Sequence, residues 1–397
     1  MINILDRAIE LQSETIKNRR YLHQNAEVGF DLIKTTKYIK NTLNRYNITP
    51  KDCGKSGIYA VIGNNKSGKT ILLRADTDAL PISEQSGEEF SSSENMHACG
   101  HDIHTAMLLS AAKILKENEC ELKNNVKILF QPAEELLLGA QEMIDSGILE
   151  NPTVNAAFML HTLNNVPLKS GTIIVSKAGA TTPSADFFQI KVIGKGAHGA
   201  MPNMSKDSII AASHIVTALD TIRTREISMY DDFVLTIGQI SGGNSNNVIQ
   251  EEVIIKGSFR STSEKVQKIT KESVDRISKN VAKALNCNCE VDFSGGCPCL
   301  INHEKLCLNV PDILRNILPN DYVIRQDEFM SDFDNSKKPT GSEDFAFYSQ
   351  QVPSLMLAIV SNLSDYEHYP LHHPEVRFDE EMMPYGVATL VSLGMYI

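Results

Sequence analysis

Residues 96–104 hold the densest group of potential metal ligands in the chain. They read Met-His-Ala-Cys-Gly-His-Asp-Ile-His and include three of the 11 histidines. Cys99 and His101 lie two residues apart around Gly100, a spacing at which side chains of a turning loop can point the same way. Thiolate and imidazole suit zinc, cobalt or nickel. The alternative is a buried thiol beside surface histidines, but the density of these residues just before a helix favours a metal site.

A pair of adjacent carboxylates, Glu134 and Glu135, follows the expected strand 126–130. Neighbouring side chains diverge on irregular backbone, so one can bind a metal while the other faces the water to be activated. Hydrolysis at a metal needs this division, because a separate base must take the proton from water and pass it to the leaving group. A solvated acidic pair is the alternative, since Glu-Glu dipeptides are common.

Other expected strands are followed by further candidates. Asp76 and Asp78 share one side of the extended segment 74–81, where they could bind a metal or orient a ligand imidazole. His161 closes a strand, and His372 lies far downstream in Tyr-Pro-Leu-His-His-Pro. Open α/β sheets place their sites at the carboxyl ends of strands, where Asp76, Asp78 and His161 are expected.

The elements around these residues alternate between strand and helix. The stretch 4–43 has helical periodicity. The predicted strands that follow are 57–63, 69–74, 126–130 and 156–160, and the predicted helices are 104–116 and 140–146. This alternation indicates an α/β layer with a largely parallel sheet.

From about residue 184 the order of elements changes to β-α-β-β-α-β. The expected elements are 186–194, 208–224, 233–241, 253–261, 264–285 and 289–293, an order typical of a ferredoxin-like unit. The α/β character returns with a helix at 305–317, a strand at 354–359 and a helix at 380–395. We therefore predict an α/β domain, with a mostly parallel central sheet flanked by helices, formed by residues 1–183 and 297–397. An inserted α+β domain at 184–296 interrupts it.

The composition limits the range of partners. Lys and Arg number 38 against 49 Asp and Glu, and the net charge of −11 argues against nucleic acid. No stretch approaches the roughly 18 uninterrupted apolar residues of a membrane span, and Asp6 and Glu10 stand where a signal peptide has its apolar run. We therefore expect a cytoplasmic protein without a membrane partner, whose eight cysteines are free thiols or metal ligands.

Taken together, several motifs resemble one family. The matching blocks are Arg20-Tyr21-Leu22-His23 with Glu27, then 74–82, 96–106, 130–135, His161, 194–202, 247–249, 257–260, 341–347 and 371–374. They are similar to those of the di-metal amidohydrolases, which include hippurate hydrolases, N-acyl-amino-acid deacylases and indoleacetyl-amino-acid hydrolases. This family is a branch of the aminoacylase and carboxypeptidase clan of zinc peptidases. The resemblance implies a zinc-peptidase-like catalytic domain with an inserted dimerisation or lid domain.

The resemblance also implies roles for single residues. The implied ligands of two divalent ions per subunit (zinc, manganese, cobalt or nickel) are Cys99, His101, Glu135, His161 and His372. Glu134 would be the general base and acid, Asp78 would support a ligand, and His104 would support the loop. His373 competes with His372, but the family pattern places the ligand first in Leu-His-x-Pro.

For the inserted domain the resemblance implies contacts with substrate. His198, in Gly-Ala-His-Gly, would reach the active site of the other subunit of a homodimer or tetramer and donate to the oxyanion. Asn247 and Arg260 would hold the substrate carboxylate or oxyanion, since an Arg fork suits a carboxylate. Gly341 would allow a close backbone approach. Taken alone, Asn247 and Arg260 are equally compatible with a turn and a strand end.

The sequence therefore predicts a metal-dependent amidohydrolase that cleaves small N-acyl amino acids into a carboxylic acid and a free amino acid. A dipeptidase or carboxypeptidase of the same clan is one alternative, and a non-catalytic metal-binding dimer is another. The cysteines at 287, 289, 297 and 299 suggest a second metal site. Their C-x-C spacing is unusual for zinc, however, and strand alternation explains the paired positions equally well, so we favour an interpretation without a second metal site.

Overall fold

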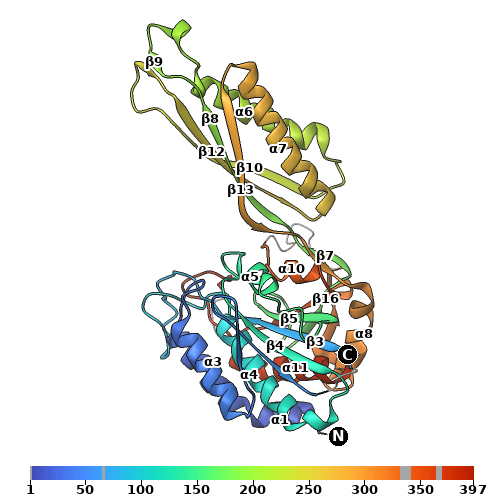
Figure 1. Ribbon diagram of the computed structural model, residues 1–397. Helices are drawn as coiled ribbons and strands as arrows, with labels where there is room; N and C mark the ends of the chain where they lie inside the picture. Colours follow the sequence, from blue (N-terminus) through green and yellow to red (C-terminus); the bar gives the residue numbers. More distant parts are fainter. Residues whose placement is uncertain (1, 65–67, 331–340, 364–368) are drawn as a thin grey trace. The chain divides into compact units, whose positions relative to one another are not determined.

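The computed structural model describes every residue except 1, 65–67, 331–340 and 364–368. Contacts within the chain divide it into two units. Unit 1 comprises Met1–Gly179, Ile301–Lys338 and Asp344–Ile397, and unit 2 comprises Ala180–Leu300 and Pro339–Glu343. Each unit has its own apolar core, and Figure 1 labels many of the elements of each unit.

Unit 1 is built on an eight-stranded sheet in the order β1-β2-β4-β3-β5-β16-β6-β15. The strands are β1 (Lys51–Cys53), β2 (Gly57–Ile62), β3 (Thr70–Asp76), β4 (Asn125–Gln131), β5 (Ala156–Leu163), β6 (Ile173–Val175), β15 (Val323–Arg325) and β16 (Ser354–Val360). At its centre β4, β3, β5 and β16 are parallel neighbours. Antiparallel pairs join β1 to β2, β2 to β4 and β6 to β16. The predicted α/β class with a mostly parallel sheet is confirmed.

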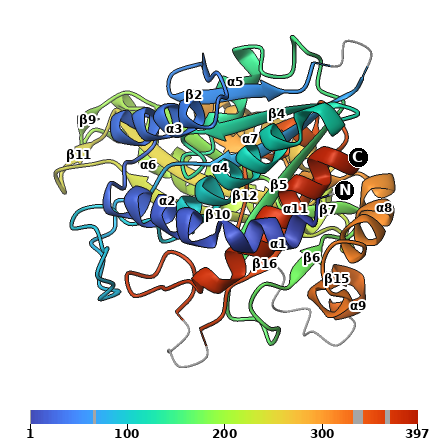
Figure 2. The same cartoon turned by 90° about the horizontal axis from the view of Figure 1, so that it is seen from below.

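Helices cover this sheet, as Figure 2 shows from a second direction. They are α1 (Ile4–Glu10), α2 (Gln12–Gln24), α3 (Ile33–Arg45), α4 (His101–Glu117), α5 (Gly139–Asp145), α8 (Glu304–Arg315), α9 (Gln326–Met330), α10 (Ala346–Ser349) and α11 (Met383–Tyr396). Every residue of β3 and β4 is buried, as expected of strands covered on both faces. The helical stretch expected at 4–43 is divided into three helices. The break before α3 includes Gly29, whose φ of 60° does not fit a right-handed helix.

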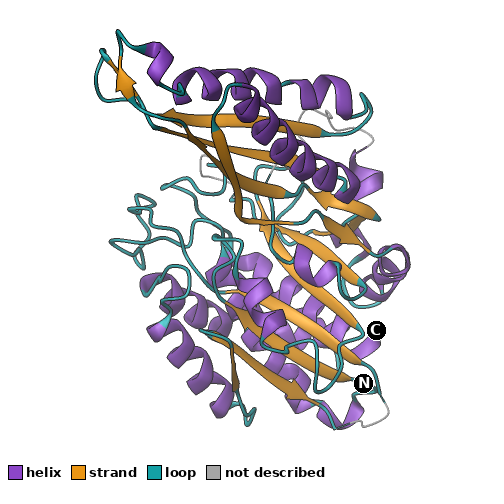
Figure 3. Ribbon diagram, turned by 45° about the horizontal axis from the view of Figure 1, so that its top comes forward, coloured by secondary structure: helices purple, strands orange, loops and turns teal. Residues whose placement is uncertain are grey.

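Unit 2 has the predicted order of elements. They are β8 (Ala185–Ile193), α6 (Ser208–Leu219), β10 (Phe233–Ser241), β12 (Glu252–Ser261), α7 (Glu264–Ala284) and β13 (Asn288–Cys297). The sheet order is β10-β12-β8-β13 with antiparallel neighbours, which is the ferredoxin-like arrangement. Figure 3 shows both helices on one face of the sheet. The helix expected at 208–224 ends earlier, at Leu219, and a π-helical turn follows at Ile222–Glu226.

Two short sheets complete the description. β9 (Ala197–His198) pairs with β11 (Val248–Ile249), and β7 (Gly179–Thr182) pairs with β14 (Leu300–Asn302). Within the described part of the chain, no helix combines the length and the apolar character needed to span a bilayer.

Candidate metal centre

Parallel strands carry several potential donors to one edge of the unit 1 sheet. β3 ends at Asp76, β4 ends three residues before Glu134, and β5 contains His161 near its end. Because β4, β3 and β5 are parallel neighbours, their carboxyl ends meet. The helix α4 adds His101 as its first residue.

The turn before α4 depends on Gly100. Its φ is 84°, a left-handed conformation that glycine adopts without strain. A Cβ at this position would lie 2.5 Å from Thr162 Oγ1, and that hydroxyl donates a 3.0 Å hydrogen bond to the carbonyl oxygen of Cys99. Glycine therefore lets the loop pack against β5 and brings Cys99 and His101 to the donor set.

The structure brings together the five residues predicted as ligands. Donor atoms of Cys99, His101 and Glu135 lie within 4.8 Å of one another. Cys99 Sγ is 3.6 Å from His161 Nε2, and His372 Nε2 is 3.5 Å from Glu135 Oε1. The group contains a thiol, three imidazoles and a carboxylate, which is a donor set suited to zinc and similar divalent ions.

Two buried polar atoms of this group are arranged as expected for a cation site. His101 Nδ1 lies 2.8 Å from the carbonyl oxygen of Asp78, which fixes the ring. In the described part of the chain, His101 Nε2 and Glu135 Oε1 have no hydrogen-bond partner, and these two atoms are 4.0 Å apart. Burying unpartnered polar atoms costs free energy, and a metal ion held between them would remove that cost.

His104 uses both ring nitrogens within the protein. The backbone N–H of Thr162 donates to His104 Nε2 at 2.8 Å, so this nitrogen is the acceptor. Nδ1 therefore carries the proton and faces Asp76 Oδ1 at 2.6 Å. Although its atoms lie near those of Asp76, His101 and His161, His104 orients Asp76, in keeping with the supporting role implied by the resemblance.

The Asp78 carboxylate positions the Glu134–Glu135 pair by accepting hydrogen bonds from the backbone N–H groups of both residues. Its Oδ1 accepts from the N–H of Glu134 at 3.0 Å and its Oδ2 from the N–H of Glu135 at 3.2 Å. Ala133, with a φ of 55°, turns the chain into this position. The carboxylate of Glu134 then lies with its Oε2 3.9 Å from His101 Nε2, facing the donor set.

Burial and neighbouring charges set the protonation of the group. Burial, with the charges of Asp78 and Asp76, raises the pKa of Glu135 to about 7. Burial lowers the pKa of His161 to about 3, so this ring is neutral and can act as a ligand. Burial also opposes the charge on His101, but Asp76 and Cys99 raise the pKa of His101 well above its ordinary value. A divalent cation would favour the ionised carboxylate and the neutral imidazole.

Sequence reasoning gave no role to the network that holds Asp76. Arg74 Nη1 donates to Asp76 Oδ2 at 2.6 Å, and Arg74 Nη2 donates to Asp344 Oδ1 at 2.8 Å. Asp344 also accepts from Gln131 Nε2 at 2.9 Å and from the N–H of Ala140 at 2.8 Å. The signal available in the sequence was the position of two polar residues, Arg74 and Gln131, near the carboxyl ends of two buried strands.

The two downstream histidines have different surroundings. His372 adopts a φ of 68° and its N–H donates to the carbonyl oxygen of Ala98 at 3.0 Å, which ties it to the loop before α4. His373 instead stacks on Tyr369 with ring centroids 4.3 Å apart. The geometry therefore places His372, rather than His373, beside Glu135.

The predicted substrate residues of unit 2 fall into two places. His198 and Asn247 lie together, because β9 pairs with β11 and the N–H of Gly199 donates to the carbonyl oxygen of Asn247 at 2.8 Å. Both side chains are exposed. Arg260 lies in β12 and donates to Ser342 Oγ at 2.7 Å, next to the exposed Gly341.

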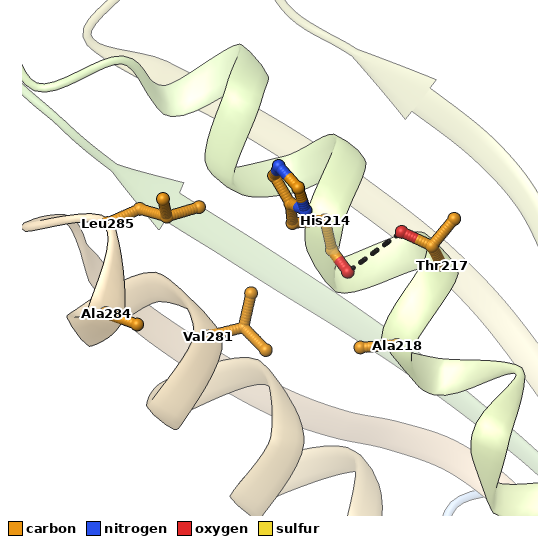
Figure 4. Close-up of a pocket in the computed structure, with 6 residues that line it drawn as sticks. All are labelled: His214, Thr217, Ala218, Val281, Ala284 and Leu285. Atoms are coloured by element: carbon orange, nitrogen blue, oxygen red, sulfur yellow. Dashed lines mark hydrogen bonds between the residues drawn. The ribbon is translucent and has the colours of Figure 1, made fainter.

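Two other features of unit 2 lie outside this set. A surface hollow of about 440 Å³ between α6 and α7 is shown in Figure 4 and includes none of the predicted site residues. Its lining residues are His214, Thr217, Ala218, Val281, Ala284 and Leu285. Among the described residues, the cysteines at 287, 289, 297 and 299 belong to no group of three or more potential metal donors within 4.8 Å of one another.

Comparison with known proteins identifies the class. The chain matches the model of Peptidase family M20/M25/M40 over residues 72–395. The chain belongs to this family, and it is a hydrolase of amide bonds.

Individual relatives support the same assignment. The chain is 35% identical over 373 residues to N-acetyl-L-cysteine deacetylase of Bacillus subtilis (strain 168), covering 93% of this chain and 85% of that protein. It is 31% identical over 397 residues to hippurate hydrolase of Campylobacter jejuni subsp. jejuni, covering 99% of each. The crystal structure of Bacillus subtilis YXEP protein, a dinuclear metal-binding peptidase of the M20 family, matches with a TM-score of 0.79 at 29% identity. That match covers 97% of this chain and 98% of that one. The predicted family is confirmed.

Proposed function

We propose that the protein is a metal-dependent amidohydrolase that cleaves N-acyl amino acids of the hippurate, N-acetyl or indoleacetyl type. The products are a carboxylic acid and a free amino acid. One observation carries the proposal. The Glu134 carboxylate lies 3.9 Å from His101 Nε2, which has no hydrogen-bond partner among the described residues, so a candidate base lies beside the proposed metal ligands. The names of the relatives support acylated amino acids as the substrate class.

The proposed cofactor is a pair of divalent cations. The proposed ligands are Cys99, His101, Glu135, His161 and His372. When bound, the cations would polarise the amide carbonyl and lower the pKa of water. The thiol and imidazoles favour zinc, cobalt or nickel, and the carboxylate also suits manganese. The dinuclear relative supports the number two.

In this proposal the chain's own residues move the proton and hold the substrate. Glu134 accepts a proton from the attacking water and returns it to the leaving amine. Asp78 keeps Glu134 in place through the backbone hydrogen bond described above. Asn247 and Arg260 bind the substrate carboxylate or the oxyanion, and Gly341 gives the backbone room to approach.

We further propose that the protein is a homodimer, or a tetramer built from it, through residues 184–296. Residues 1–183 and 297–397 would form the catalytic domain. His198 lies beside the Glu252 end of β12, whereas Arg260 is near its other end. The strand between them spans roughly 25 Å at ~3.3 Å per residue, which is longer than an acyl amino acid. A second subunit would supply His198 to a substrate that Arg260 holds. The eight free cysteines support a cytoplasmic location.

Replacing Glu134 with Gln tests the assigned base. The substitution keeps the shape of the side chain but removes the proton acceptor, so we expect kcat to fall at least about 100-fold. Bound metal, measured by elemental analysis, should stay at the wild-type level. Glu150→Gln, at an exposed carboxylate, is the matched control and should be fully active. Glu134→Gln with a tenth of wild-type activity would show that another group is the base.

A substrate panel separates the alternatives. Hippurate, N-acetyl amino acids and indoleacetyl amino acids are assayed beside dipeptides at equal concentration. Higher kcat/KM for the acylated amino acids supports the proposal, whereas preference for dipeptides indicates a dipeptidase or carboxypeptidase. Bound metal without hydrolysis of any substrate would indicate a non-catalytic metal-binding protein.

A further inference from the structure

A buried network of charges lies behind the loop that carries Cys99 and His101. His23 in α2 and Asp102 in α4 are at most 2% exposed. His23 Nδ1 is 2.9 Å from Asp102 Oδ2, and Arg19 Nε donates to the same oxygen at 3.1 Å. The other ring nitrogen, His23 Nε2, is 3.0 Å from Glu84 Oε1. These residues belong neither to the donor set nor to the proposed proton path.

His23 acts as a buried cation between two carboxylates. Both of its ring nitrogens face carboxylate oxygens, which can only accept when ionised, so both nitrogens must carry protons. Burial alone lowers the pKa of His23, but Asp102 and Glu84 raise it to about 9. The imidazolium thus joins α2, α4 and the segment that follows Glu84.

Asp102 of this network is joined by a peptide bond to His101, one of the proposed metal ligands. Asp102 directly follows His101 and is the second residue of α4, so fixing the Asp102 carboxylate fixes the first turn of the helix. Glu84 is itself held, because its Oε2 accepts from the N–H of Ser92 at 2.7 Å. The first turn of α4 is therefore tied to α2 through Asp102, and to the segment that follows β3 through the hydrogen bond between His101 and the carbonyl oxygen of Asp78.

We infer that His23 is a positioning residue for the metal centre: through Asp102, it holds the first turn of α4 in the orientation in which Cys99 and His101 aim at one ion. The inference rests on the metal site of the proposed function, but not on the identity of the substrate. His23 acts on the donors without touching a metal or substrate.

The test measures metal binding rather than turnover. Zinc affinity is obtained by competition with a chromophoric chelator, and the thiolate-to-cobalt absorption of cobalt-loaded protein reports the contact with Cys99. Removing partners that orient metal ligands commonly costs 10–100-fold in affinity, so we expect His23→Gln and Asp102→Asn each to weaken zinc binding roughly tenfold and to reduce the cobalt band.

A matched control separates positioning from general stability. Thr15 in α2 and Ser110 in α4 are buried, and their hydroxyl oxygens are 2.7 Å apart. This contact joins the same two helices roughly 12 Å along α4 from Asp102. Thr15→Val should lower the Tm but leave zinc affinity and the cobalt band unchanged.

The outcomes decide whether His23 positions the metal ligands. Wild-type zinc affinity, within about twofold, and an unchanged cobalt band in His23→Gln and Asp102→Asn would overturn the inference. Equal weakening by Thr15→Val would also overturn it. If His23→Gln does not fold, Glu84→Gln takes its place. This variant removes only the carboxylate that faces His23 Nε2, and it is judged together with Asp102→Asn by the same criteria. Failure of the proposed function would appear instead as metal binding without hydrolysis of acylated amino acids.

Discussion

At the scale of residues, two histidines three positions apart in one helix have different tasks because their neighbours differ. His104 has both nitrogens bonded within the protein. His101 has one nitrogen held by the carbonyl oxygen of Asp78, and its Nε2 has no hydrogen-bond partner among the described residues. Residue type alone could not separate them. The resemblance assigned His104 a supporting role, and the hydrogen bonds give the physical reason for it.

The charge on His23 predicts a pH dependence of stability. Its pKa in the folded protein, about 9, lies above the ordinary 6.5. The contribution to stability is therefore complete below pH 6.5 and is lost as pH rises through 9. For metal-free protein we expect the free energy of unfolding to fall by on the order of 3 kcal/mol across this window.

Urea denaturation between pH 6 and pH 10 measures this effect. The same series on His23→Gln serves as the control, because other titrating groups act in both proteins. The difference in unfolding free energy between the two proteins should shrink as pH rises. A difference that stays constant would contradict a charged His23.

At the scale of elements, the turn before α4 couples backbone conformation to side-chain packing. Gly100 combines a φ of 84° with a position where a Cβ would meet Thr162 Oγ1 at 2.5 Å. Gly147 has a similar φ of 82°, but a Cβ there would meet nothing within 4 Å. The two glycines thus share the backbone requirement and differ in packing.

We expect Gly100→Ala to lower the free energy of unfolding more than Gly147→Ala. The backbone strain common to both is about 1–3 kcal/mol, and the clash with Thr162 adds to it only at position 100. Urea denaturation of both variants measures the difference. Equal losses would show that the packing of Thr162 against this turn is unimportant.

The long helices and strands could be predicted from the sequence. The strands and helices that carry the donors show clear periodicity, and β10 was predicted to the residue. The three-residue strands β6 and β15 were not predicted, because so few residues show no pattern. The meeting of Cys99, Glu135 and His372 could not be derived from periodicity, since it depends on the order of parallel strands and on a loop more than 200 positions away. That part came from the family resemblance.

At the scale of the whole molecule, the proposed sharing of His198 between subunits predicts complementation. His198→Ala lacks the donor that a partner needs, and Glu134→Gln lacks its own base, so each homodimer should be inactive. A mixed dimer would have one complete site, formed by the His198→Ala subunit's Glu134 and the other subunit's His198.

Coexpression of the two variants in equal amounts tests this expectation. Random pairing in a twofold-symmetric dimer gives half mixed dimers with one site of two, so about a quarter of wild-type activity should return. Activity no higher than that of the separate variants would contradict a shared site. Sedimentation of the mixture confirms whether dimers form.

Asp344 anchors the hydrogen-bond network around Asp76 within unit 1. It is the first residue of unit 1 after a segment that belongs to unit 2, and three separate groups hold its carboxylate. Through Arg74, the Asp76 carboxylate is thus braced against a residue that is itself fixed at three points within unit 1.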